Sequence, residues 1–98
     1  MKLNDQEKYF AAAAIKQMYA ASEGDTAAQF AYADILQRIE HDAYDIRAAT
    51  FLSQLADEII SHTEKLMLSG SVNEDAIVRA STVKEIYARI KEKTNEQQ

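Results

Sequence analysis

The sequence contains no cysteine, no proline and no tryptophan, and it has only two glycines, Gly24 and Gly70. Without cysteine the chain can form no disulfide framework, no thiolate zinc site and no thiol nucleophile. A Gly-x-Ser-x-Gly motif and a glycine-rich phosphate loop are also missing. These absences exclude the sequence signatures of covalent catalysis and of nucleotide binding by backbone amides.

Long hydrophobic runs are lacking as well. The longest apolar stretch without a charge runs from Tyr9 to Ile15, far short of the roughly 20 residues that a membrane span needs. Residues 1–7 turn acidic and lead into no cleavable apolar segment, unlike a signal peptide. We therefore expect a cytoplasmic protein that makes no contact with a membrane.

What the sequence does contain is typical of one small acidic domain over residues 1–98. It has 11 Lys and Arg against 16 Asp and Glu, a net charge of −5, which disfavours phosphate backbones as partners. A chain of this size buries only roughly 60–68% of the surface that its unfolded form exposes. Its stability margin is therefore thin, and we expect self-association, most simply as a homodimer.

The composition favours helix almost throughout, because alanine is the commonest residue and the two glycines are the main interruptions. Asn4 with Glu7 three residues later has the form of a capping box for the first helix. Gly24 is suited to end that helix, which runs to about Ser22. The broad apolar face of this helix consists of Phe10, Ala11, Ala14, Ile15, Met18, Tyr19 and Ala21.

Residues 25–69 contain neither glycine nor proline. Asp25 or Thr26 can cap a helix at their start, and the segment then allows either one long helix or two shorter ones. The first apolar stripe consists of Ala28, Tyr32, Ile35, Leu36, Ile39, Ala43 and Ile46. The second consists of Ala48, Leu52, Leu55, Ile59 and Leu66. The stripes lie about half a turn apart at about 100° per residue, so an unbroken helix would point its two ends to opposite sides. We therefore favour a break at 41–45, where two aspartates can cap a new helix.

The last boundary is formed by residues 69–71, and Ser71 with Glu74 has the spacing of a second capping box. The helix behind it carries a seam of the coiled-coil kind: Ala76, Ala80, Val83, Tyr87 and Ile90. The polar residues 94–98 are expected to fray. The predicted fold class is all-α, a small antiparallel helical bundle of four helices, or of three with a long central helix.

One aromatic residue does not fit the apolar stripes. Phe30 lies opposite the stripe of Ile35 and Ile39, and at helical spacing it shares a polar face with Asp34, Gln37 and His41. An aromatic on a polar face indicates a contact for a partner, so these four residues form the candidate partner-contact site. The interpretation that we favour for Phe30 is that the Gly24 loop or a neighbouring helix covers it, because single apolar residues outside a stripe are normal.

The C-terminal helix departs from the acidic pattern. Its basic residues, Arg79, Lys84, Arg89, Lys91 and Lys93, are opposed by only two glutamates between 79 and 93. Such a cluster is typical of a nucleic-acid contact. Basic residues near a helix C-terminus also offset the helix dipole and can pair with acidic neighbours, which gives a second explanation.

Residues 56–60, Ala-Asp-Glu-Ile-Ile, resemble the second half of the magnesium site in small all-α pyrophosphohydrolases of the MazG family. The resemblance implies a helical dimer that holds Mg²⁺ with acidic clusters. The upstream Glu-Glu-x-x-Glu run that would supply the other oxygen ligands has no equivalent in 29–40. In this alternative the metal-site candidates are Asp57, Glu58 and His62.

The leading hypothesis is a non-enzymatic regulator, adaptor or inhibitor that acts by protein–protein contact. Its partners are a second copy of the chain and an unidentified protein, and it needs no cofactor and no catalytic residue. Well-punctuated amphipathic helices without a converging catalytic motif favour this hypothesis. Nucleic-acid binding through the basic helix and a MazG-like, magnesium-dependent nucleotide pyrophosphohydrolase are the alternatives.

Overall fold

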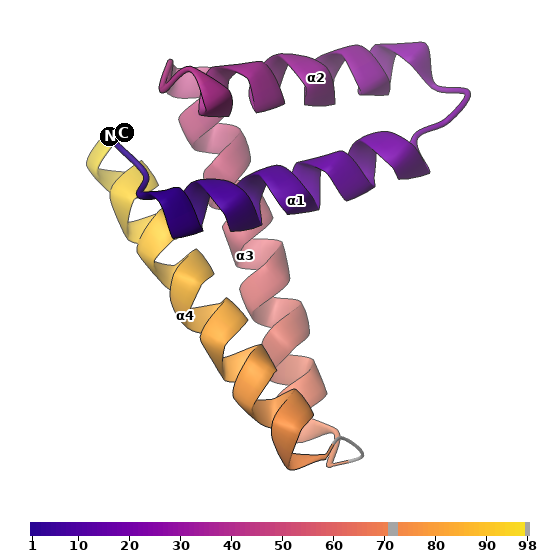
Figure 1. Cartoon of the computed structure of the whole chain (residues 1–98), viewed down its shortest axis with the longest axis vertical. Coiled ribbons are helices and arrows are strands. Elements are labelled where there is room, and N and C mark those ends of the chain that lie inside the picture. The colour runs from indigo at the N-terminus through magenta and orange to yellow at the C-terminus, as the bar shows by residue number, and fades with distance from the viewer. Residues whose placement is uncertain (71–72, 98) are drawn as a thin grey trace.

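The computed structural model describes residues 1–70 and 73–97. Within them the chain forms four α-helices: α1 (Asp5–Ala21), α2 (Thr26–Glu40), α3 (Ile46–Leu68) and α4 (Glu74–Gln97). The helices pair as two antiparallel hairpins, α1–α2 and α3–α4, and the first hairpin lies across one end of the second (Figure 1). This arrangement confirms the predicted all-α bundle in its four-helix form.

The starts of the first two helices follow the predicted capping chemistry. The Glu7 amide donates to Asn4 Oδ1 at 2.8 Å, and the Asn4 amide donates to Glu7 Oε1 at 2.9 Å, which completes the capping box. Asp25 caps α2 by accepting from the Ala28 amide at 3.1 Å. Gly24 has a φ of +92°, a left-handed conformation that glycine adopts at low cost, so the loop can turn directly after α1.

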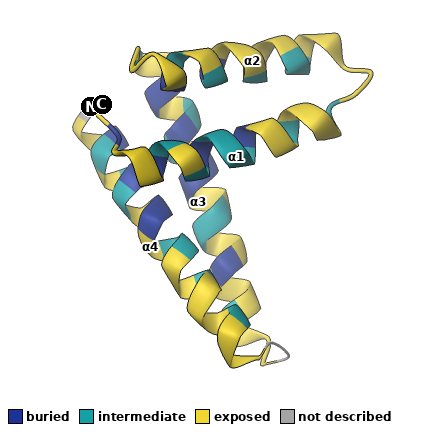
Figure 2. Ribbon diagram, viewed as in Figure 1, coloured by how far each residue is buried: buried dark blue, intermediate teal, exposed yellow. Residues whose placement is uncertain are grey.

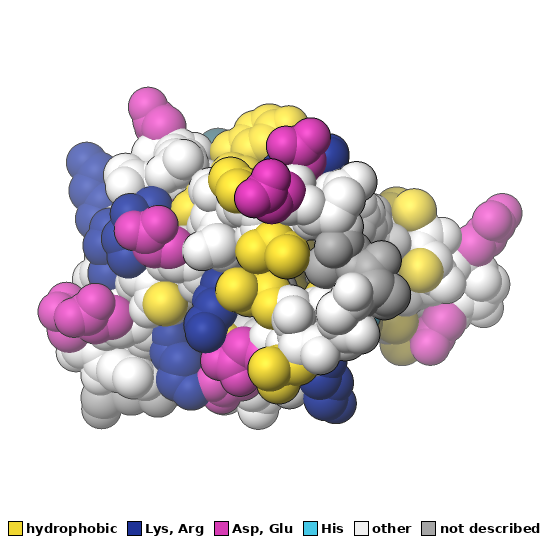
Figure 3. All heavy atoms as spheres, turned by 90° about the horizontal axis from the view of Figure 1, so that it is seen from below, with side chains coloured by type: hydrophobic (Ala, Val, Ile, Leu, Met, Phe, Trp, Pro, Cys, Tyr) yellow, Lys and Arg dark blue, Asp and Glu magenta, His cyan; other side chains and the backbone are white. Residues whose placement is uncertain are grey.

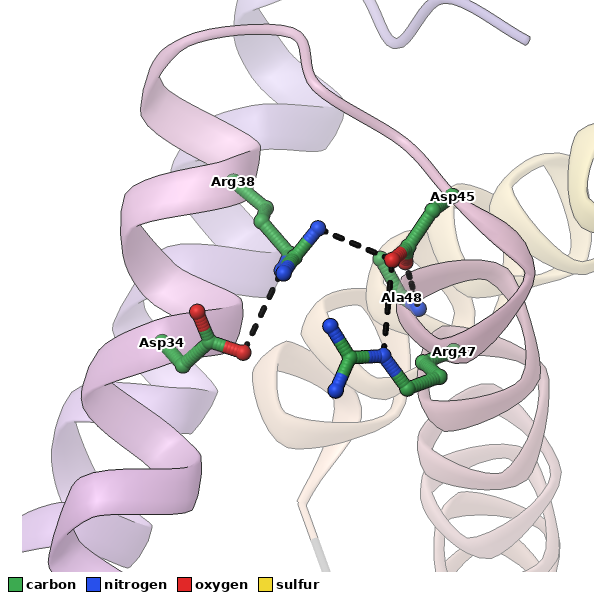
Figure 4. Close-up of polar contacts among 5 residues, drawn as sticks. All are labelled: Asp34, Arg38, Asp45, Arg47 and Ala48. Carbon is green, nitrogen blue, oxygen red and sulfur yellow. Dashed lines mark hydrogen bonds and ion pairs between the residues drawn. The ribbon is translucent and has the colours of Figure 1, made fainter.

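The predicted break between two central helices is also confirmed, since α2 ends at Glu40 and α3 begins at Ile46. Asp45 caps α3 by accepting from the Ala48 amide at 2.9 Å. Asp42 turns the chain with a φ of +52°, a conformation that aspartate tolerates better than most residues. Arg38 joins the two helices, because its guanidinium lies 2.9 Å from Asp45 Oδ2 and 3.2 Å from Asp34 Oδ2 (Figure 4).

The boundary before α4 lies partly outside the described residues, and with it the Ser71 half of the expected capping box. Asn73 provides the cap that the structure describes, because its Oδ1 accepts from the Ala76 amide at 2.8 Å. Gly70 has a φ of +69° at the end of α3.

The core lies where the two hairpins cross and between α3 and α4 (Figure 2). Its buried apolar side chains are Leu3, Ala11, Ile15, Ile35, Ile39, Ala48, Leu52, Leu55, Ala56, Ile86, Tyr87 and Ile90. Nine of the predicted stripe residues belong to this set, and seven more are half-buried and pack against it: Phe10, Ala14, Met18, Tyr32, Leu36, Ile59 and Val83. The expectation was wrong for Tyr19, Ile46 and Leu66, which are 43%, 58% and 42% exposed, and for Ala21 and Ala43, which are exposed as well.

The C-terminal end corrects a second expectation. Residues 94–97 continue α4 instead of fraying, and Thr94 is fully buried. The Thr94 hydroxyl donates to the Lys91 carbonyl at 2.7 Å, and Lys93 next to it pairs with Glu7 of α1. Contact with the start of the chain therefore orders this end, whereas Gln98 lies outside the described residues.

Tyr87 ties α4 to α1 in the middle of the core. Its hydroxyl donates to the Phe10 carbonyl at 2.7 Å, and burial raises the pKa of this phenol to about 12. We expect Tyr87→Phe to lower the free energy of unfolding by about 1 kcal/mol, because the bond is lost and the carbonyl stays buried. Tyr9→Phe is the matched control, since Tyr9 is 71% exposed. Urea unfolding of both variants measures the difference, and equal stabilities would contradict the role of the bond.

The pKa values of two aspartates at the α2–α3 junction lead us to expect a loss of stability in acid. The Ala48 hydrogen bond, followed by the Arg38 charge, lowers the pKa of Asp45, and the Lys8 ammonium lowers that of Asp42. Because both folded pKa values lie below the ordinary 3.8, their contribution is present above that pH and is lost as the pH falls through the lower folded values.

Asp45→Asn isolates this effect, because asparagine can still accept from the Ala48 amide but cannot be protonated in this range. We expect the variant to lose less stability than the wild type between pH 5 and pH 2, measured by urea unfolding. An identical pH dependence for the two proteins would show that Asp45 does not contribute.

Candidate protein-contact surface

The outer part of the α1–α2 hairpin projects away from α3 and α4 (Figure 1). No residue from Lys16 to Asp34 is buried, although these residues form helix on both sides of the Gly24 loop (Figure 2). We call residues 16–34 the arm. The arm is therefore an ordered part of the fold that has no buried core of its own.

Local contacts explain why the arm is helical. The Ser22 hydroxyl donates to the Met18 carbonyl at 2.8 Å, and the Gln29 side chain reaches across the hairpin to the Tyr19 carbonyl at 3.4 Å. Half-buried side chains, such as Met18 and Tyr32, pack where the arm meets the core. Short helical segments without much burial are marginally stable in water, so cover from outside would stabilise the arm.

A shallow groove runs between the two helices of the arm. It consists of two adjoining cavities of about 160 and 230 Å³, and Tyr19 and Ala33 line both. We call it the Tyr19 groove. Its lining residues are Lys16, Tyr19, Thr26, Gln29, Phe30, Tyr32, Ala33 and Leu36. The groove thus combines aromatic and small apolar surface with a few polar groups, as protein-contact sites commonly do.

The structure places all four candidate partner-contact residues, Phe30, Asp34, Gln37 and His41, on the exposed surface of α2 or at its C-cap. Phe30 is 73% exposed and lines the smaller cavity of the Tyr19 groove. This exposure shows that the interpretation in which the Gly24 loop or a neighbouring helix covers Phe30 is wrong. Asp34 has a structural contact as well, since it pairs with Arg38.

The basic residues of α4 lie mostly against acidic side chains of the same chain. Lys84 pairs with Glu64 at 3.2 Å, and Lys91 pairs with Asp57. Lys93 and Arg89 both face Glu7, and the Arg89 guanidinium also donates to the Gln6 side chain at 3.0 Å. Arg79 is exposed, and among the residues described it has no ion pair. These pairs match the second explanation of the basic cluster, and nucleic-acid binding stays a prediction.

The three metal-site candidates, Asp57, Glu58 and His62, all lie on α3. Asp57 is engaged by Lys91, Glu58 lines a small cavity with Met18 and Phe51, and His62 is exposed. In the described part of the chain, no group of three His, Asp or Glu side chains is placed to hold a metal ion. The geometry therefore adds nothing to the resemblance to MazG enzymes.

A second exposed apolar cluster lies at the far end of the α3–α4 hairpin and is seen end-on in Figure 3. It consists of Leu66, Leu68, Ile77 and Val78. No cavity among the better-formed ones has these residues in its lining.

Comparisons with protein-family models, with curated proteins and with solved structures gave no match to this chain. None of the four described helices combines the length with the apolar content that a bilayer span requires.

The pairing of α4 with α1 leads to a prediction about ion pairs. Glu7 is fully buried, whereas the Asp57 side chain is 55% exposed, and both pair with lysines of α4. We expect Glu7→Gln to cost about 2 kcal/mol, because Lys93 and Arg89 lose a charged acceptor in a buried position. Asp57→Asn should cost less than about 1 kcal/mol, since solvent screens exposed pairs. Urea unfolding tests both, and similar costs would contradict this ranking.

Proposed function

We propose that this chain is a cytoplasmic, non-enzymatic protein that acts as a regulator, adaptor or inhibitor by protein–protein contact, and that the Tyr19 groove is where a protein partner binds. The observation that carries the proposal is the arm, which is helical from Lys16 to Asp34 around its loop but buries none of these residues. A partner that covers the groove would supply the missing burial.

The chemistry of the Tyr19 groove supports a protein as the ligand. Exposed aromatic side chains are enriched where proteins bind one another, and they often provide much of the binding energy. Tyr19 and Phe30 supply such surface, while Lys16 and Gln29 provide polar groups beside it. A helix with apolar residues on one face fits a shallow groove between two helices, because its side chains can enter cavities of this size.

Site-specific photo-crosslinking in the cells that make the protein tests the proposal. Benzoylphenylalanine replaces Phe30 in one variant and Val78, which is 63% exposed at the other apolar cluster, in the control. We expect a protein adduct from position 30, and we expect Ala33→Arg to reduce its yield at least about fivefold by placing a long charged side chain in the groove.

The proposal is overturned if position 30 gives no protein adduct, or if position 78 gives the adduct instead. Circular dichroism of each variant confirms that the helices are retained. Mass spectrometry of the adduct identifies the bound protein, whether it is a different chain or a second copy.

A further inference from the structure

The molecule exposes more surface than its mass requires. Its accessible surface is 6263 Å², whereas a compact monomer of 11.0 kDa exposes roughly 5,600 Å². Its radius of gyration of 14.0 Å likewise exceeds the ~12.6 Å typical of a domain of this length. The excess of roughly 650 Å² approaches the ~800 Å² that each partner contributes to a stable interface.

The arm also presents a projection beside a depression. Phe30 projects at one end of the Tyr19 groove, and the cavity of about 230 Å³ lies at the other end beside Leu36. In an interface with two-fold symmetry, each copy must offer a surface that complements itself. A projecting aromatic next to a cavity meets this requirement, because each Phe30 can enter the cavity of the other copy.

The sequence of α2 sets the register of such a pair. In an antiparallel pair centred on Ala33, residues equally far on either side of Ala33 lie opposite one another. Phe30 then faces the partner's Leu36, which lines the larger cavity. The small side chain of Ala33 allows the two helices to approach closely at the axis. Exposed residues follow steps of four and three along this face, the spacing of a coiled-coil seam: Thr26, Phe30, Ala33, Gln37 and Glu40.

Charges agree with this register. Asp25 falls opposite the partner's His41, and Glu40 falls opposite the partner's Thr26, the first residue of α2. The positive end of the helix dipole favours a carboxylate at that place. Asp34 falls opposite the partner's Tyr32. In this register, no two like charges lie directly opposite one another along α2.

We infer that a second copy of this chain occupies the Tyr19 groove, in an antiparallel dimer with its two-fold axis at Ala33. The inference rests on the contact function proposed above and names the partner. The two arms then form a four-helix interface, in which each arm provides the apolar cover that the other lacks.

Disulfide trapping tests the position of the axis directly, because the wild-type chain has no cysteine to give a background. Ala33→Cys places one thiol of each copy beside the axis, where close helices bring Cα atoms within disulfide reach. Ala88→Cys is the matched control, since Ala88 is also an exposed alanine on a helix. Under mild oxidation at micromolar concentration, we expect the purified Ala33→Cys protein to become mostly a linked dimer and the Ala88→Cys protein to stay monomeric.

Sedimentation equilibrium measures the dissociation constant of the proposed dimer. We expect Phe30→Ala to weaken dimerisation about tenfold or more, as truncation of a central aromatic usually does. Val78→Ala removes exposed apolar surface outside the arm and should leave the dissociation constant unchanged. Far-ultraviolet circular dichroism at a concentration where the wild type is monomeric separates loss of dimer from loss of helix.

Each outcome has a distinct meaning. A wild-type protein that stays monomeric up to about millimolar concentration overturns the dimer but leaves the groove open to a different protein. A dimer that resists Phe30→Ala and gives no Ala33→Cys disulfide uses another surface, which also overturns the inference. A photo-adduct from position 30 to another protein alone keeps the contact function and refutes the second copy as its partner.

Discussion

The buried carboxylate of Glu7 joins the two hairpins, and the rest of the arrangement depends on this joint. One of its oxygens accepts from the Asn4 amide and so starts α1, and the same carboxylate faces Lys93 and Arg89 of α4. A buried carboxylate needs such partners, because removing it from water without them is costly. The joint fixes the beginning of α1 against the end of α4, and Tyr87 extends the contact by one further hydrogen bond. Since the anchoring lies at one end of α1, the other end extends beyond the core as the arm.

Much of the fold could be predicted from short-range chemistry. Asn4 with Glu7, Asp25, and the aspartates at 41–45 all act at helix starts or breaks as their positions in the sequence indicated. The apolar stripes of α2 and α3 lie about half a turn apart, so a break between the two helices was expected. Asp45 caps the helix that follows this break. These features are local, because the side chain that ends or starts a helix lies within a few residues of the backbone group that it binds.

The long-range features could not be predicted in the same way. Periodicity assigned Tyr19 to the apolar face of α1, which is correct for the helix alone, but it gives no information on where the neighbouring hairpin ends. Thr94 is polar and near the C-terminus, so its burial depends on the partners that Lys93 finds on α1. The phase of Phe30 along α2 differs from that of the core residues and indicated a partner contact, but the favoured interpretation, that a loop or helix covers Phe30, was wrong. The Tyr19 groove beside Phe30 could not be predicted, because it depends on where α1 lies relative to α2.

The arm has a consequence for motion within the native state. Because the hydrophobic core is built from α3, α4 and the anchored ends of α1 and α2, the stretch around Gly24 can unwind without exposing that core. Local opening of this kind has its own, smaller free energy, separate from that of global unfolding. Amide protons of the arm are therefore expected to exchange with solvent through this local opening. A partner that covered the groove would slow their exchange and leave the protection of the α3 amides unchanged.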